Sequence, residues 1–128
     1  MKIEINNDSV FINGIKYLPK TAKNLLASEV DGMPYVIIRT YSAGVHLGYL
    51  KRKESTLAGM EVTLVNSRRM WQWAGALTLS DLATNGTSKP ENCKLTVEVS
   101  RIDLVAIEII SVTEKAFKNL ISISIWKQ

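Results

Sequence analysis

The sequence predicts an α+β fold with a mostly antiparallel, curled β-sheet, barrel- or sandwich-like, two short helices and an N-terminal β-hairpin. Three observations predict it. Short runs rich in β-branched residues recur along the 128 residues, two segments show helical spacing, and one Asn-Gly pair lies between apolar runs. With 46% hydrophobic and 22% charged residues, the composition is that of a globular protein, so we expect a packed core rather than disorder.

Residues 1–20 are expected to form a small unit of their own. Ile3 and Ile5 alternate with charged residues, and Asn13-Gly14 separates two apolar runs. Asn-Gly is the strongest short hairpin signal, because both residues tolerate the positive φ of a type I′ turn. Such a small unit is marginal alone. We therefore expect it to dock on the main body or on a second copy, which predicts a homo-oligomer.

The main domain is expected over residues 34–128, and its first half reads as an antiparallel meander. A dense β-branched run is typical of a central strand that is apolar on both faces, and an alternating strand follows after a tight turn. The predicted segments are a strand at 35–41, a turn at 42–44, a strand at 45–50, a polar loop at 51–59 and a strand from Val62.

The second half adds the two helices. The first is expected at 76–83, where Asn85-Gly86 supplies a left-handed stop, and the second follows Thr113, which is a plausible N-cap. Alternation of Leu95, Val97 and Val99 predicts a strand with one wet face. The remaining predicted segments are a helical turn at 22–28, an apolar strand at 102–112 and a short closing strand at 123–126.

The segment from Asn66 to Gly75 is the most informative part of the chain, because it places two of the three tryptophans beside two arginines. In an extended chain Arg69, Trp71 and Trp73 share one face, together with Ser67. Aromatic rings beside a guanidinium suit a flat, negatively charged ligand. The alternative is that both tryptophans belong to the core while Arg69 reaches into water, and core packing is the more frequent role of tryptophan.

Catalytic and metal-binding patterns are missing from the sequence. His46 is the sole histidine and has no facing carboxylate at a sensible spacing, so a structural or ligand-contacting role is favoured. Cys93 is a single cysteine without an activating partner. Gly48, inside a predicted strand, marks either a bulge or the close approach of another group. We expect no enzyme activity, no metal and no cofactor.

Charge and hydropathy restrict the partners. The net charge of +4 is mild, and its two basic clusters are small, so nucleic acid is a secondary candidate partner. The first residues lack the apolar run of a signal peptide, and no segment is long enough to cross a membrane. We expect a cytoplasmic protein without a membrane partner.

From about Tyr35 to Trp126 the chain resembles an uncharacterised domain of unknown function carried by tailed bacteriophages and prophages. The resemblance rests on residues 36–48, 66–76 with Leu79, 106–110 and Thr113-Glu114. The family brings no established activity. What the resemblance implies is a context, namely a phage accessory protein expressed inside a bacterium.

In that context the residues favour a binding pocket over a flat basic surface. The predicted function is non-enzymatic binding, and sequestration, of a nucleotide-like host defence signal. The alternative is a protein–protein interaction module that inhibits a host protein or a nucleic-acid-linked defence complex, since Trp, Tyr and Arg also dominate protein interfaces. The predicted ligand-binding residues are Arg39, Tyr41, His46, Arg69, Trp71 and Trp73.

Overall fold

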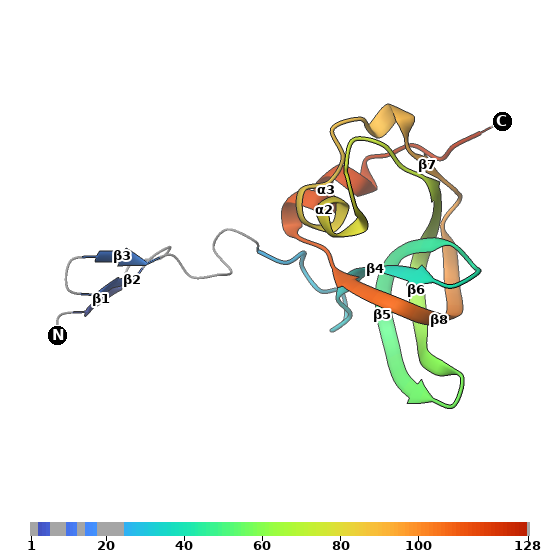
Figure 1. Ribbon diagram of the computed structural model, residues 1–128, viewed down its shortest axis with the longest axis horizontal. Coiled ribbons are helices and arrows are strands. Elements are labelled where there is room, and N and C mark those ends of the chain that lie inside the picture. Colours follow the sequence, from blue (N-terminus) through green and yellow to red (C-terminus); the bar gives the residue numbers. More distant parts are fainter. Residues whose placement is uncertain (1–2, 6–9, 13–14, 18–24, 128) are drawn as a thin grey trace.

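The computed structural model describes residues 3–5, 10–12, 15–17 and 25–127 (Figure 1). Near the N-terminus, β1 (Ile3–Ile5), β2 (Val10–Ile12) and β3 (Ile15–Tyr17) form an antiparallel three-stranded sheet. Glu4 pairs with Phe11, which in turn pairs with Lys16. This sheet supports the predicted N-terminal hairpin. The Asn13-Gly14 turn itself lies outside the described residues.

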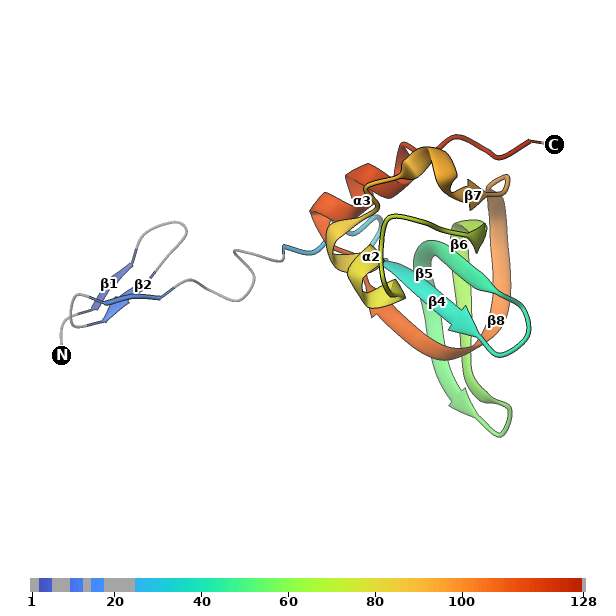
Figure 2. The ribbon, with the colours of Figure 1, turned by 45° about the horizontal axis from the view of Figure 1, so that its top comes forward.

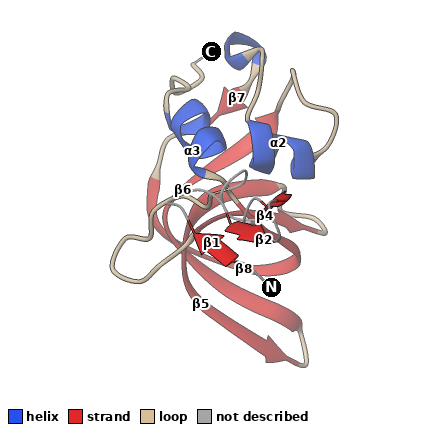
Figure 3. Ribbon diagram, turned by 90° about the vertical axis from the view of Figure 1, so that its left-hand side faces the viewer, coloured by secondary structure: helices blue, strands red, loops and turns tan. Residues whose placement is uncertain are grey.

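A second sheet of five strands carries the main body. Its order is β5-β4-β8-β6-β7, and β5 pairs with β6 as well, so the sheet curls back on itself (Figure 3). All its strand pairings are antiparallel, as predicted. The strands are β4 (Tyr35–Thr40), β5 (Val45–Thr56), β6 (Gly59–Gln72), β7 (Lys94–Leu95) and β8 (Val99–Ser111).

Two α-helices, α2 (Leu79–Asn85) and α3 (Glu114–Ile121), lie together against one side of the sheet (Figure 2). A short 3-10 helix, η1 (Pro90–Asn92), precedes β7. The predicted Thr113 cap and Gly86 stop are confirmed, whereas α2 begins at Leu79 and not at residue 76 as predicted. The Thr113 hydroxyl accepts a hydrogen bond from the Ala116 N–H at 3.1 Å, and Gly86, with φ of 76°, closes α2. Both features are local, which is why the sequence shows them.

The core has two parts, one on each face of the sheet. On the helix-covered face, Ile37 and Leu47 of the sheet pack with Leu82 and Leu120 of the helices. On the face enclosed by the curl, a smaller cluster consists of Val36, Ile38, Val62, Leu64 and Ala106. Strand β4 contributes to both clusters, which confirms that its run of apolar residues is buried on both faces.

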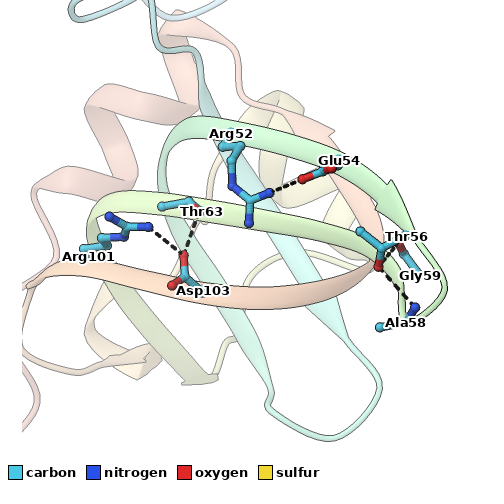
Figure 4. Close-up of polar contacts among 8 residues, drawn as sticks. All are labelled: Arg52, Glu54, Thr56, Ala58, Gly59, Thr63, Arg101 and Asp103. Carbon is cyan, nitrogen blue, oxygen red and sulfur yellow. Dashed lines mark hydrogen bonds and ion pairs between the residues drawn. The ribbon is translucent and has the colours of Figure 1, made fainter.

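The predicted loop at 51–59 is wrong, because most of it is a β-ribbon. Strand β5 continues to Thr56 and β6 begins at Gly59, so the two strands form a long hairpin (Figure 3). Strand β6 also pairs with β8 from Met60 onward. Charged side chains occupy both faces of this ribbon, which hides the alternation that reveals a strand. Along it, Arg52 forms an ion pair with Glu54 at 2.6 Å (Figure 4).

A polar contact also fastens the base of the ribbon to β8. The buried Thr63 hydroxyl donates to Asp103 at 2.6 Å, and Asp103 lies 3.6 Å from Arg101 (Figure 4). The hydrogen bond from Thr63 is the main reason that the pKa of the Asp103 carboxyl lies below its usual value. The Asp103 carboxylate therefore stays ionised at the outer surface of the sheet.

Three further predictions differ from the structure. The strand expected at 95–99 is interrupted, since β7 ends at Leu95 and β8 begins only at Val99. Between them, the Thr96 N–H donates to the Arg69 carbonyl at 2.9 Å. Residues 25–28 are not helical, since Leu26 forms a β-bridge with Thr113. The closing strand reduces to a single bridge between Leu95 and Ile125. In the part of the chain that the structure describes, no helix could span a membrane.

Candidate functional site

A β-bulge in β6 determines which side chains face which side of the sheet. The pairing of β5 with β6 steps from Tyr49 opposite Val65 to Leu47 opposite Arg68, so β6 has one extra residue here. Asn66, inside this step, has a φ of 50°, a left-handed conformation that asparagine tolerates better than most residues. Beyond the bulge, Arg68 lies opposite a residue of the helix-covered core.

The largest hollow described here, which we call the Arg68 pocket, has a volume of about 530 Å³. That volume is within the range of small-molecule sites. Strands β4, β5 and β6, the segment between β7 and β8, helix α3 and the segment after it all contribute to it. Its lining residues are Tyr35, Tyr49, Asn66, Arg68, Glu98, Phe117 and residues 121–125.

Three aromatic rings form the apolar wall of the Arg68 pocket. The ring of Tyr35 packs edge-on against those of Tyr49 and Phe117, with centroids 5.1 and 4.8 Å apart. Burial raises the pKa of the Tyr35 phenol, and the charge of Arg68 opposes this rise in part. Tyr35 therefore stays a neutral phenol at physiological pH. Tyr49 and Phe117 are half-buried and keep apolar surface for a ligand.

Arg68 supplies the positive charge of the pocket. Its Nη1 donates to the Ile123 carbonyl at 2.8 Å and its Nε to the Thr96 carbonyl at 3.1 Å. Its Nη2 is buried and finds no hydrogen-bond partner among the described residues. Burial lowers the pKa of the guanidinium, whereas Tyr35 and Glu98 raise it. The side chain thus holds two segments of the pocket wall through Nη1 and Nε, while its Nη2 has no acceptor among the described residues.

Two of the predicted site residues, His46 and Arg69, are neighbours. They lie opposite each other in β5 and β6, and with Ser67 they line a separate hollow of about 180 Å³. His46 is only 1% exposed, and its Nε2 donates to the Ala43 carbonyl at 2.8 Å. Burial lowers the pKa of the imidazole, the Ala43 carbonyl opposes this, and Arg69 lowers it further. A neutral His46 is therefore part of the structure.

The other four predicted residues lie elsewhere. Arg39 and Trp73 line a third hollow of about 360 Å³, where Arg39 forms an ion pair with Glu108 at 3.1 Å. Tyr41 is 92% exposed and lines none of these three hollows.

Trp71 is 52% exposed and packs edge-on against Trp126 at 5.0 Å, with the Lys94 ammonium 4.8 Å from each ring. Trp73 packs against the helix-covered core, whose residue Leu47 lies opposite Arg68 and not Arg69, so Trp73 does not share a face with Arg69 as a regular strand would require. The pairing of β6 with β7 is irregular between Met70 and Gln72, and β6 ends at Gln72, before Trp73.

Sequence reasoning did not select the residues of the Arg68 pocket. Alternation had placed Arg68 with Met70 and Tyr49 with Leu47, so the two strand faces could be read from the sequence. The long-range packing of Phe117 and Glu98 against them could not. Their places depend on how α3 and the segment before β8 fold back over the sheet.

Together, the fold and the Arg68 pocket define a small α+β domain with a cavity of ligand size on the helix-covered face of an antiparallel sheet. The chain belongs to the family described as Domain of unknown function (DUF6948), whose model matches residues 33–120. No curated protein and no solved structure matches the chain.

Proposed function

We propose that this chain is a non-enzymatic binding protein that takes up a small nucleotide-like molecule in the Arg68 pocket. One observation carries the proposal: a cavity of about 530 Å³ is lined by half-buried aromatic rings and by Arg68, whose buried Nη2 has no partner among the described residues. Aromatic surface beside an arginine suits a flat molecule rich in hydrogen-bond acceptors.

The chemistry of the lining favours binding over turnover. His46 does not line this pocket, and its Nε2 is already used by Ala43. Tyr35 is a neutral phenol whose pKa is raised, which makes it a poor general base. The role we propose is sequestration of a nucleotide-like host defence signal in the cytoplasm of a bacterium, by a phage-derived accessory protein. The resemblance to phage-borne domains supports that setting, and the N-terminal sheet is the proposed contact of a homo-oligomer.

The test is recovery of the ligand. The purified protein is incubated with a nucleotide extract from bacteria that have active defence signalling, then washed and heat-denatured, and the released molecules are identified by mass spectrometry. We expect an intact nucleotide-like molecule to be released. Release of a cleaved product instead would identify an enzyme and contradict the proposal.

Two matched variants connect the ligand to the pocket. Ser124 is exposed and lines the Arg68 pocket, whereas Ser100 is exposed and lies outside it. Ser124→Trp should fill the pocket and abolish ligand recovery, while Ser100→Trp should leave recovery unchanged. If both variants release the same amount as the wild type, the ligand binds elsewhere.

A second candidate function, an interaction module, is supported by exposed apolar side chains. Leu57 at the tip of the β5–β6 ribbon is fully exposed, and so is most of Tyr41. Large apolar or aromatic side chains in solvent often mark contacts with other proteins. This function is favoured if a host protein co-purifies with the wild type and with Ser124→Trp but is lost with Leu57→Ser.

A further inference from the structure

The Arg68 pocket contains a second charged group, and the pair suggests what the ligand presents. Glu98 lines the same pocket as Arg68, and its charge raises the pKa of the Arg68 guanidinium. Among the ion pairs of the described residues, none joins the two side chains. A ligand between them would have to accept a hydrogen bond from Arg68 on one side and donate one to the Glu98 carboxylate on the other.

Glu98 makes a phosphate a poor occupant of the place beside Arg68. A phosphate carries one or two negative charges at neutral pH and would meet the carboxylate of Glu98, at a cost in repulsion. An uncharged ring with acceptors on one edge and N–H donors on the next avoids that repulsion. Such a ring also fits against Tyr49 and Phe117, which offer apolar surface.

Guanine best meets these requirements among the common nucleobases. Its O6 and N7 are adjacent acceptors, which arginine contacts more often than any other base edge. Its N1–H and 2-amino group are adjacent donors, which match the two oxygens of a carboxylate. We propose that the Arg68 pocket selects guanine, with Arg68 reading the O6 and N7 edge, Glu98 accepting from N1–H and the 2-amino group, and the phosphate left in solvent. The inference rests on the proposed function and narrows its ligand class.

The experiment is calorimetric titration of the full chain with guanosine, GMP, inosine and adenosine. Inosine is guanosine without the 2-amino group, so it isolates one hydrogen bond to Glu98. We expect guanosine and GMP to bind within about threefold of each other, because the phosphate makes no contact. Inosine should bind about tenfold more weakly or worse, since one charge-assisted hydrogen bond is lost. Adenosine should bind more weakly still.

Glu98→Gln provides the matched variant. Glu98 is exposed, so the substitution should leave the melting temperature unchanged. An amide offers one acceptor where the carboxylate offers two, so the preference for guanosine over inosine should shrink to about twofold or less. The control is Glu29→Gln, an exposed glutamate outside the pocket, which should retain the full preference.

Two other outcomes separate this inference from the proposed function. If GMP binds far more tightly than guanosine, and adenosine binds as tightly as guanosine, Arg68 recognises the phosphate. The guanine inference is then overturned, and the proposed function stands. If none of the four compounds binds and Ser124→Trp leaves the ligand recovered from extracts unchanged, both proposals are overturned.

Discussion

Gly48 of β5 faces Ser67 of β6 so closely that a methyl group at Gly48 would lie 3.0 Å from the Ser67 Cβ. The sequence left two explanations for this glycine, a bulge or a close approach. The structure shows both, because the pairing of β5 with β6 shifts between Leu47 and Tyr49. The glycine is needed for space, since it allows the two strands to stay paired across the bulge that positions Arg68.

We therefore expect Gly48→Ala to destabilise the protein by about 1–3 kcal/mol, the usual cost of forcing a methyl group into filled space. Urea denaturation of the single variant measures the loss. The double variant Gly48→Ala with Ser67→Gly tests the cause, because it removes two of the three close contacts of the methyl group, those with the Ser67 Cβ and Oγ. The loss of stability in the double variant should be smaller than the sum of the losses in the two single variants. Simple additivity would show that the contact with Ser67 is not responsible.

The neutral state of His46 predicts a pH dependence of stability. Burial holds the pKa of His46 in the folded protein below its usual 6.5. As the pH falls below 6.5, the unfolded chain binds a proton that the folded chain resists, so unfolding becomes easier. The melting temperature should drop between about pH 7.5 and about pH 5.5, a window above the titration of ordinary carboxylates.

The control for this prediction is His46→Gln, which has no titrating side chain. Its melting temperature should vary less than that of the wild type across the same range, after allowance for its lower overall stability. Equal slopes for the two proteins would mean that His46 does not titrate differently in the folded and unfolded states.

Features determined by neighbouring residues could be predicted from the sequence. Strand β4, the Thr113 cap and the Gly86 stop all depend on a few adjacent residues, and all three were expected where they occur. The β5–β6 ribbon was mistaken for a loop, because its charged side chains face solvent on both sides. A strand that is exposed to solvent on both faces lacks the alternation of apolar and polar residues by which a strand is predicted.

The Arg68 pocket could not be predicted for a different reason. It joins Tyr35, Arg68, Glu98 and Phe117, which come from separate elements far apart in the sequence. Alternation assigns a residue to a face but does not say which element covers that face. The segment from Asn66 to Gly75 does contain a residue of the pocket, Arg68. The bulge and the irregular pairing at Met70 decide which of its side chains line a pocket.

The two tryptophans of the motif should respond differently to truncation. Trp73 packs against the helix-covered core, whereas Trp71 is half-exposed and touches Trp126. We expect Trp73→Ala to cost about 3 kcal/mol or more, as for a buried large side chain, and Trp71→Ala to cost about 1 kcal/mol, as for an exposed aromatic pair. Thermal melting of both variants gives the comparison. Equal losses would contradict the different environments seen here.

Thr113 joins helices α2 and α3, which makes it more than a helix cap. Its hydroxyl accepts from the Ala116 N–H at 3.1 Å and donates to the Thr84 carbonyl at 2.7 Å, and its own N–H donates to the Ala83 carbonyl at 3.0 Å. The side chain is buried, so its removal leaves the Thr84 carbonyl without its hydroxyl partner.

Thr78 offers a matched control, since it caps α2 in the same way, with a 3.1 Å bond from the Asp81 N–H, but is exposed. We expect Thr78→Ala to cost about 1 kcal/mol and Thr113→Ala about 2–3 kcal/mol, because only the second removes a buried hydrogen bond along with the cap. Thr113→Ser keeps the hydroxyl and should recover most of that loss. Urea denaturation of the three variants decides the matter. If Thr113→Ala costs no more than Thr78→Ala, the bond to Thr84 contributes nothing to the position of α3, the helix that carries Phe117 into the Arg68 pocket.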